Sequence, residues 1–218
     1  MHKTARLHIG YWLFFLFIQC SYGLNDNESW TSIGFEKKLP YKLELEFEQE
    51  LRLNNKLSTF KQTFSEVSIS YKVFDGLKIQ IPYRYAIFED KIKQRFSFGG
   101  SYKYKFKPVS LKYRTKFQRT YEDGEIPENM IRNKFTIEYK LSKKIEPYVS
   151  GELLHLYNTD HNQLDEYRVS FGVAVDLPRK KSIKIFYTYK KEDITKSSPD
   201  EINVFGLAYS FKWWSQNS

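Results

Sequence analysis

Two histidines, His155 and His161, are the residues best suited to act as a base near neutral pH. Ser150, Glu152 and Asp160 lie close to them in sequence. A serine, a histidine and an acid can together cleave an acyl bond by nucleophilic attack, so these residues suggest an enzyme that acts on membrane lipids. Alternation counts against that reading, because in a strand His155 faces away from the side shared by Ser150 and Glu152. We therefore expect no enzymatic activity.

Other chemical motifs are absent from the sequence. It contains no Gly-rich phosphate loop, no histidine pair with metal-ligand spacing and no nucleophile motif. Acidic residues in the polar segments 122–128 and 192–201 could hold divalent cations that bridge to lipopolysaccharide phosphates. Neither segment has the ligand spacing of a calcium-binding loop. Bases in the shorter turns lie too far apart in sequence to indicate nucleic-acid binding. We expect no metal, no cofactor and no nucleic-acid partner.

The first 23 residues resemble a secretory signal peptide. Lys3 and Arg6 precede an apolar run from Ile9 to Ile18, and small residues at Ser21 and Gly23 suit cleavage after Gly23. A membrane anchor is the alternative, but the run is too short to span a bilayer. A lipoprotein cut before Cys20 is disfavoured by the bulky Gln19. Cleavage removes the only cysteine, and export without disulfides indicates a bacterial envelope.

The composition combines features that usually exclude each other. Aromatic residues make up 18% of the chain, yet its formal net charge is +9 and its mean hydropathy is -0.60. A bundle of membrane helices is excluded, because each helix needs about 20 apolar residues. Two faces of opposite character would reconcile the aromatic content with the charge.

Alternation of apolar and polar residues supplies those two faces. From Tyr41 onward, apolar residues hold one parity and polar residues the other, which is the pattern of strands with two different faces. The pattern predicts long strands at 41–53, 67–73, 77–85, 96–106, 111–117, 135–141, 149–153, 167–175, 183–189 and 205–213. No helix is predicted after the signal peptide.

The connections alternate between short turns and longer, more polar loops. This favours an all-β, up-and-down antiparallel barrel of about ten strands, with twelve as the alternative. Short turns would face the periplasm, longer loops the exterior, and both termini would lie on the short-turn side. The segment 24–40 could add a further strand through Trp30–Leu39, but an even count leaves it outside the wall. The expected organisation is therefore 1–23 signal peptide, 24–40 N-terminal segment, 41–214 barrel and 215–218 tail.

Volume decides which face of this barrel is apolar. The apolar parity carries so many rings that a lumen of about ten strands could not hold them, since side chains already fill a barrel of about eight. We therefore expect the rings to face lipid and to form girdles at the two membrane interfaces. A lipocalin-like barrel and a secreted β-sandwich are the alternatives. The bacterial outer membrane is the expected location, with its lipid and lipopolysaccharide as partners.

The last expected strand, 204–214, has a further feature. Gly206 is followed by rings at Tyr209, Phe211 and Trp213. It resembles the closing strand that the barrel assembly machinery of the outer membrane recognises, although Val204 stands at its usually polar start. The machinery is therefore an expected partner.

A series of short motifs resembles a known family. They are Trp30, EQELR at 48–52, Tyr83-Arg84-Tyr85, Arg95, Tyr113-Arg114, Pro147-Tyr148, Glu152, Tyr167-Arg168 and Gly172. This order is similar to the uncharacterised outer-membrane barrel family catalogued as domain of unknown function 2490. A histidine that the family places before the arginine at Arg95 is Gln94 here. The resemblance implies the fold and the compartment, and no established activity.

The polar parity is expected to line the lumen, where bases outnumber acids. Acids gather in the first long strand and bases in the strands from 96 to 141. The two arcs consist of Glu44, Glu46, Glu48, Glu50, Arg52, Arg84, Arg95, Lys112, Arg114, Lys116, Arg132, Lys134, Glu138, Glu152 and Arg168. Unpaired charge is costly to bury, so an excess of bases favours water or an anion in the lumen.

Charge segregation of this kind suggests a narrow passive channel with a weak anion preference. The first alternative is a closed structural barrel whose interior charges pair with one another, or a barrel that binds ligands at the cell surface. The lipid-modifying enzyme is the weaker alternative.

Overall fold

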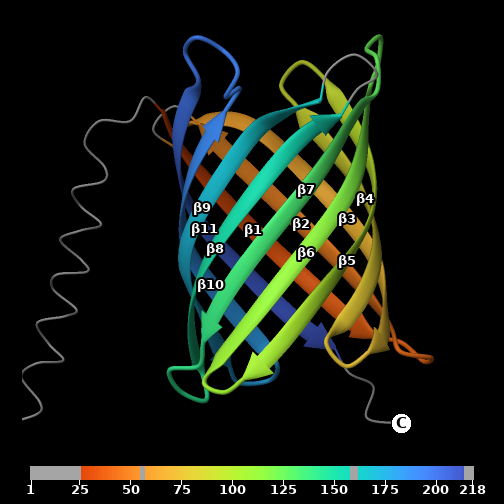
Figure 1. Ribbon diagram of the computed structural model, residues 1–218, viewed down its shortest axis with the longest axis vertical. Coiled ribbons are helices and arrows are strands. Elements are labelled where there is room, and N and C mark those ends of the chain that lie inside the picture. The colour runs from red at the N-terminus through yellow and green to blue at the C-terminus, as the bar shows by residue number, and fades with distance from the viewer. Residues whose placement is uncertain (1–25, 55–56, 158–161, 214–218) are drawn as a thin grey trace, which may run out of the picture.

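The computed structural model describes residues 26–54, 57–157 and 162–213, which form one closed β-barrel (Figure 1). The expected signal peptide and the tail lie outside the described residues. Eleven strands make up the wall: β1 (Asp26–Lys38), β2 (Leu43–Asn54), β3 (Thr59–Phe74), β4 (Leu77–Phe88), β5 (Ile92–Phe106), β6 (Val109–Glu122), β7 (Glu128–Tyr139), β8 (Ile145–Tyr157), β9 (Asn162–Leu177), β10 (Lys181–Glu192) and β11 (Asp200–Trp213).

The strand count corrects the expected ten or twelve. The segment that we expected outside the wall is β1, which pairs antiparallel with β2 and parallel with β11. An odd number of strands in an up-and-down order leaves the first and last strands running in the same direction, so the closing pair is parallel. We expected the barrel to begin and end at the same rim. That expectation was wrong, because β1 and β11 run parallel, so β1 begins at one rim and β11 ends at the other.

The connections define two rims. The short-turn rim carries 39–42, 75–76, 107–108, 140–144 and 178–180, and the long-loop rim carries 57–58, 89–91, 123–127 and 193–199. The rims differ less in connection length than expected, because β7 and β11 begin earlier than the sequence pattern indicated. The blue hairpin of β10 and β11 projects at the top of Figure 1, on the long-loop rim.

The outer face of the barrel is apolar. Ile81, Phe98 and Ile185 are 60%, 57% and 61% exposed, although each lies within a strand. The parity that includes them carries most of the exposed large hydrophobic side chains, whereas most buried residues are polar and belong to the opposite parity. The wall is therefore apolar outside and polar inside, the reverse of a water-soluble barrel. No described segment is a helix long and apolar enough to cross a membrane.

A small apolar cluster lies inside the barrel near the seam between β1 and β11. Trp30, Ile202 and Val204 are buried, and Phe186 of β10 packs against them. The Phe186 ring also covers Gly206, its directly paired neighbour on β11. This cluster gives the parallel seam side-chain contacts in addition to its backbone pairing.

Candidate functional site: the charged lumen

Glu152 of β8 is the centre of a buried ion-pair group that joins three strands. Arg132 of β7 donates from Nη2 to Glu152 Oε1 at 2.9 Å, and Arg114 of β6 donates to the same oxygen at 3.2 Å. Glu152 is only 4% exposed. Three adjacent strands are thereby joined inside the barrel by one carboxylate with two guanidinium partners.

The acids of β2 have different environments. Lys78 of β4 donates to Glu44, and Arg52 donates from Nε to Glu50 at 2.5 Å. Glu46 and Glu48 form no ion pair within the described residues. Glu46 instead lies directly opposite Glu36 of β1.

The bases also divide into paired and unpaired groups. Arg84 donates from Nε to Glu66 at 2.8 Å, and Arg168 donates to Glu166. Lys116 Nζ of β6 lies 4.0 Å from Glu66 Oε1 of β3, a long distance for an ion pair.

The remaining bases lack a carboxylate partner. Arg95 donates to the Thr120 hydroxyl at 2.9 Å. In the described part of the chain, Lys112 and Lys134 have no ion-pair partner, whereas Glu138 pairs with Lys103. These carboxylates thus pair with bases of their own strand or of strands up to three positions away around the wall, and Lys112 and Lys134 have no carboxylate partner in the described residues.

An aromatic and arginine layer lies in the long-loop half of the lumen, and we call its four members, Trp30, Arg52, Phe64 and Arg84, the arginine–aromatic layer. The Arg52 guanidinium lies 3.8 Å from the Trp30 ring centroid, and that of Arg84 lies 3.6 Å from the Phe64 centroid. Arg168 also faces the Trp30 ring from β9, at 5.4 Å. The layer therefore connects β1, β2, β3 and β4 with β9, and cation–π attraction adds to its packing.

A second buried carboxylate, Glu28, adjoins this layer. It accepts hydrogen bonds from Lys61 Nζ at 2.5 Å and Trp30 Nε1 at 2.8 Å, and Lys190 Nζ lies 3.1 Å away. Sequence reasoning missed Glu28 and Phe64, the first because β1 was placed outside the wall and the second because rings were assigned to lipid. The alternation of β1 could have revealed Glu28, since Ile33 and Phe35 hold its opposite parity.

Water reaches the two halves of the lumen unequally. The inward side chains of Lys78, Lys103 and Arg114 are 38%, 30% and 29% exposed. Glu28 and Lys190, beside the arginine–aromatic layer, are at most 2% exposed. The barrel thus has a hydrated region lined by bases and a dry layer of packed side chains.

The histidine, serine and acid group does not assemble among the described residues. Ser150 and Glu152 are buried on the inner face, whereas His155 lies beyond a β-bulge, opposite Leu164, and is partly exposed. His161 and Asp160 lie outside the described residues. The described residues therefore contain no nucleophile paired with a histidine base.

The long-loop rim carries ion pairs. Glu122 accepts from Lys91 at 3.0 Å and Lys93 at 2.7 Å, and Asp193 accepts from Lys196 at 2.5 Å. The Asp193 hydrogen bond raises the pKa of Lys196 above its usual value. No group of three or more metal-ligating side chains occurs in residues 26–54, 57–157 and 162–213.

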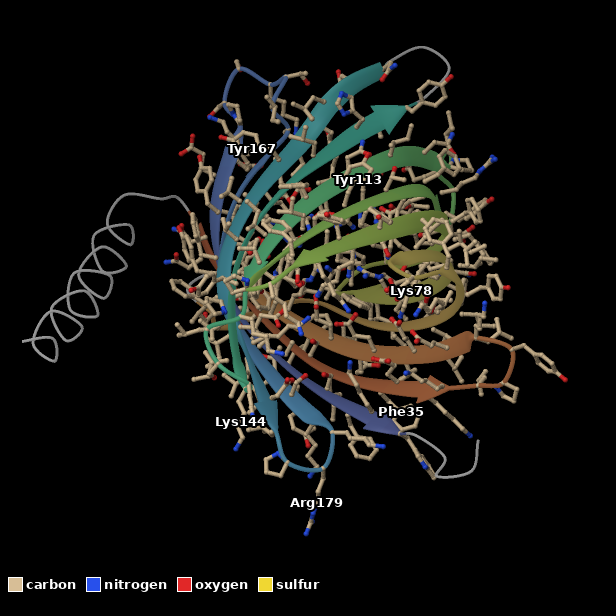
Figure 2. The ribbon with its side chains drawn as sticks, turned by 60° about the horizontal axis from the view of Figure 1, so that its bottom comes forward. Phe35, Lys78, Tyr113, Lys144, Tyr167 and Arg179 are labelled. Atoms are coloured by element: carbon tan, nitrogen blue, oxygen red, sulfur yellow. The ribbon has the colours of Figure 1, made fainter. Side chains whose placement is uncertain are left out.

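The short-turn rim is basic. Figure 2 shows Lys144 and Arg179 projecting from it. Lys42 and Arg179 hold left-handed backbone, with φ of 61° each, a conformation that non-glycine residues adopt rarely. The turns at 39–42 and 178–180 therefore place long basic side chains at positions where glycine would fit with less strain.

A closed barrel with an apolar exterior and an ion-paired interior has the fold of outer-membrane β-barrels. It shares that fold with the NanC porin, at a TM-score of 0.52 and 11% identity over 75% of this chain and 86% of the porin. A bacterial polysaccharide outer-membrane secretin gives a TM-score of 0.49 and 9% identity, over 72% and 71% of the two chains. An anion-selective porin from Comamonas acidovorans gives 0.41 and 9%, over 79% and 54%.

The chain belongs to the family described as "Protein of unknown function (DUF2490)", which matches residues 27–200. The resemblance drawn from the short motifs is thereby confirmed. No curated protein matches the chain in sequence.

Proposed function

We propose that the protein is an integral barrel of the bacterial outer membrane and a narrow passive channel with a weak anion preference. The observation that carries this is the hydrated part of the lumen, where inward bases are partly exposed and Lys112 and Lys134 lack a carboxylate partner in the described residues. Fixed positive charge facing water attracts anions and repels cations. The arginine–aromatic layer would restrict the passage to small solutes.

The same proposal includes the location of the protein in the cell envelope and its partners. The segment 1–23 would direct export, short turns would face the periplasm and longer loops would face lipopolysaccharide. The outward rings of β11 would be read by the barrel assembly machinery. These partners are supported by the sequence pattern and by the apolar outer face.

A conductance measurement tests the channel. Purified protein in planar bilayers is expected to give small current steps that favour chloride over potassium. Lys112→Glu together with Lys134→Glu should abolish or reverse that preference, because the change places two negative charges where two positive ones stood. Lys140→Glu, at the rim, is the matched control and should shift selectivity less. Wild-type protein that inserts but gives no current steps would overturn the channel.

One structural observation favours a closed barrel as the second candidate. Phe64 and Trp30, which are 2% and 8% exposed, lie within the lumen together with the dry pair Glu28 and Lys190. A lumen sealed at that layer would serve stability or surface binding and would pass no ions.

Phe64→Ala separates the two candidates. The Phe64 ring packs against the Arg84 guanidinium, so removing the ring should open the dry layer. If the wild type conducts, the conductance of the variant should be about twofold higher or more. Phe98→Ala, which removes a lipid-facing ring, is the matched control and should leave the step size unchanged. Current in Phe64→Ala alone, with a silent wild type, would identify the closed barrel.

A further inference from the structure

Four polar side chains of β6, β7 and β8 lie together on the inner wall and have no hydrogen-bond or ion-pair partner among the described residues. Lys112 is directly opposite Thr136, and Thr136 is directly opposite Ser150. Lys134 precedes Thr136 by two residues and so faces the same side. Diagonal neighbours on adjacent strands lie roughly 7–8 Å apart between Cα atoms, so the two lysines are close enough to contact one small group.

The Ser150 hydroxyl is the most informative member of this group. It is buried, at 3% exposure, and its Oγ has no hydrogen-bond partner in the part of the chain that the structure describes. A hydroxyl that faces inward and is withdrawn from water normally has a partner, because a buried polar group left without a hydrogen bond is destabilising. Ser170 of β9 lies opposite Ser150 but accepts from Thr188 at 2.8 Å. The Ser150 hydroxyl is therefore available to donate to a bound group.

Neighbouring acids do not neutralise the two lysines. Glu152, opposite Lys134, is held by Arg132 and Arg114. Glu138, two residues beyond Thr136, is paired with Lys103. The nearest carboxylates thus have closer basic partners, and the positive charge of both ammonium groups remains to be balanced.

We propose that Lys112, Lys134, Thr136 and Ser150 form a binding site for an oxyanion, the carboxylate or phosphate group of a small solute. Ammonium groups bind phosphate and carboxylate as point charges, and hydroxyls can donate to the remaining oxygen lone pairs. The site deepens the proposed channel, since it names the class of solute that the lumen would select. Partial exposure of both lysines leaves it open to the hydrated region.

Calorimetric titration tests the site without any need for conductance. Inorganic phosphate and acetate are titrated in separate experiments into the detergent-solubilised barrel at equal ionic strength. Binding of phosphate, of acetate or of both supports the site and distinguishes the two chemistries, and binding of neither overturns it. Lys112→Gln and Lys134→Gln should each weaken binding about tenfold, which corresponds to about 1.4 kcal/mol.

Two further variants separate binding from folding. Ser150→Ala should weaken oxyanion binding severalfold without lowering the unfolding midpoint of the ligand-free barrel, because its Oγ has no hydrogen-bond partner among the described residues. Lys140→Gln removes a lysine at the rim and should leave binding intact. Equal affinity in wild type, Lys112→Gln and Lys134→Gln would overturn the site. A barrel that binds phosphate but carries no current keeps the site and overturns the channel, and a conducting barrel that binds neither anion does the reverse.

Discussion

Replacing Glu152 by glutamine is expected to lower the free energy of unfolding of the barrel by about 3 kcal/mol. The substitution keeps the size of the side chain and removes the charge that holds Arg132 and Arg114. Breaking one partner of a buried ion pair costs about 3–5 kcal/mol, because the other charge stays buried without compensation. We expect the lower end of that range, since the amide oxygen of glutamine still accepts a hydrogen bond. Urea unfolding in detergent micelles, followed by intrinsic fluorescence, measures the change.

Glu46→Gln is the matched control for this prediction. It is the same chemical change on the same inner face, but Glu46 lies opposite Glu36 and forms no ion pair in the described chain. Like charges directly opposite each other are destabilising, so neutralising Glu46 should not lower the unfolding free energy. The change is expected to be no more than about 0.5 kcal/mol, because no ion pair is broken. A Glu152→Gln protein as stable as the wild type, or an equal loss in Glu46→Gln, would contradict the assignment of Glu152 as the centre of the ion-pair group.

The two faces of the wall could be predicted from the sequence because strand geometry sends alternate residues to opposite sides. Ile81, Phe98 and Ile185 illustrate this, since each was on the apolar parity and each is exposed on the outer face. A period of two needs no knowledge of neighbouring strands. The family could likewise be recognised, because its motifs are short and follow one another along the chain.

The first strand could not be placed in the same way. Ser29 and Thr31 occupy outward positions of β1, so only part of its lipid face is apolar. The preference for an even strand count then outweighed its alternation. β1 belongs to the wall because it pairs with the edge of β11, a strand far away in sequence. The parallel register of that pair cannot be read from the residues of β1 alone.

Ion-pair partners were also beyond the reach of sequence. Parity shows that a base faces the lumen, but several acids on the curved wall lie within reach of each base. Glu66 accepts from Arg84 on the next strand and also lies 4.0 Å from Lys116 of β6, three strands away around the wall. Phe64 is a different case, because its ring faces inward against the Arg84 guanidinium of the paired strand β4, whereas the sequence pattern assigned rings to the lipid face.

Gly99→Ala is expected to prevent assembly of the barrel or to lower its unfolding free energy by about 3 kcal/mol. A Cβ atom on Gly99 of β5 would lie 2.4 Å from the carbonyl oxygen of Thr115 and 2.9 Å from Lys116 Cγ, both on the paired strand β6. The oxygen belongs to the backbone, so it can move away only if the two strands separate. Overpacking of this kind costs about 1–3 kcal/mol, occasionally more. Heat-dependent migration in SDS gels reports the fraction folded, and urea unfolding reports the stability.

The neighbouring glycine supplies the control for Gly99→Ala. A Cβ on Gly100 would meet only the Lys78 carbonyl oxygen at 3.6 Å, an ordinary contact. Gly100→Ala should therefore fold normally and be slightly more stable, because alanine loses less conformational freedom on folding. Adding Lys116→Ala to Gly99→Ala removes the side-chain contact and leaves the Thr115 carbonyl in place, so it should not restore folding. Rescue by that double variant would identify the flexible Lys116 side chain as the obstacle. Normal folding of Gly99→Ala itself would show that β5 and β6 can separate at this point, and so that the close approach at Gly99 is not required for closure.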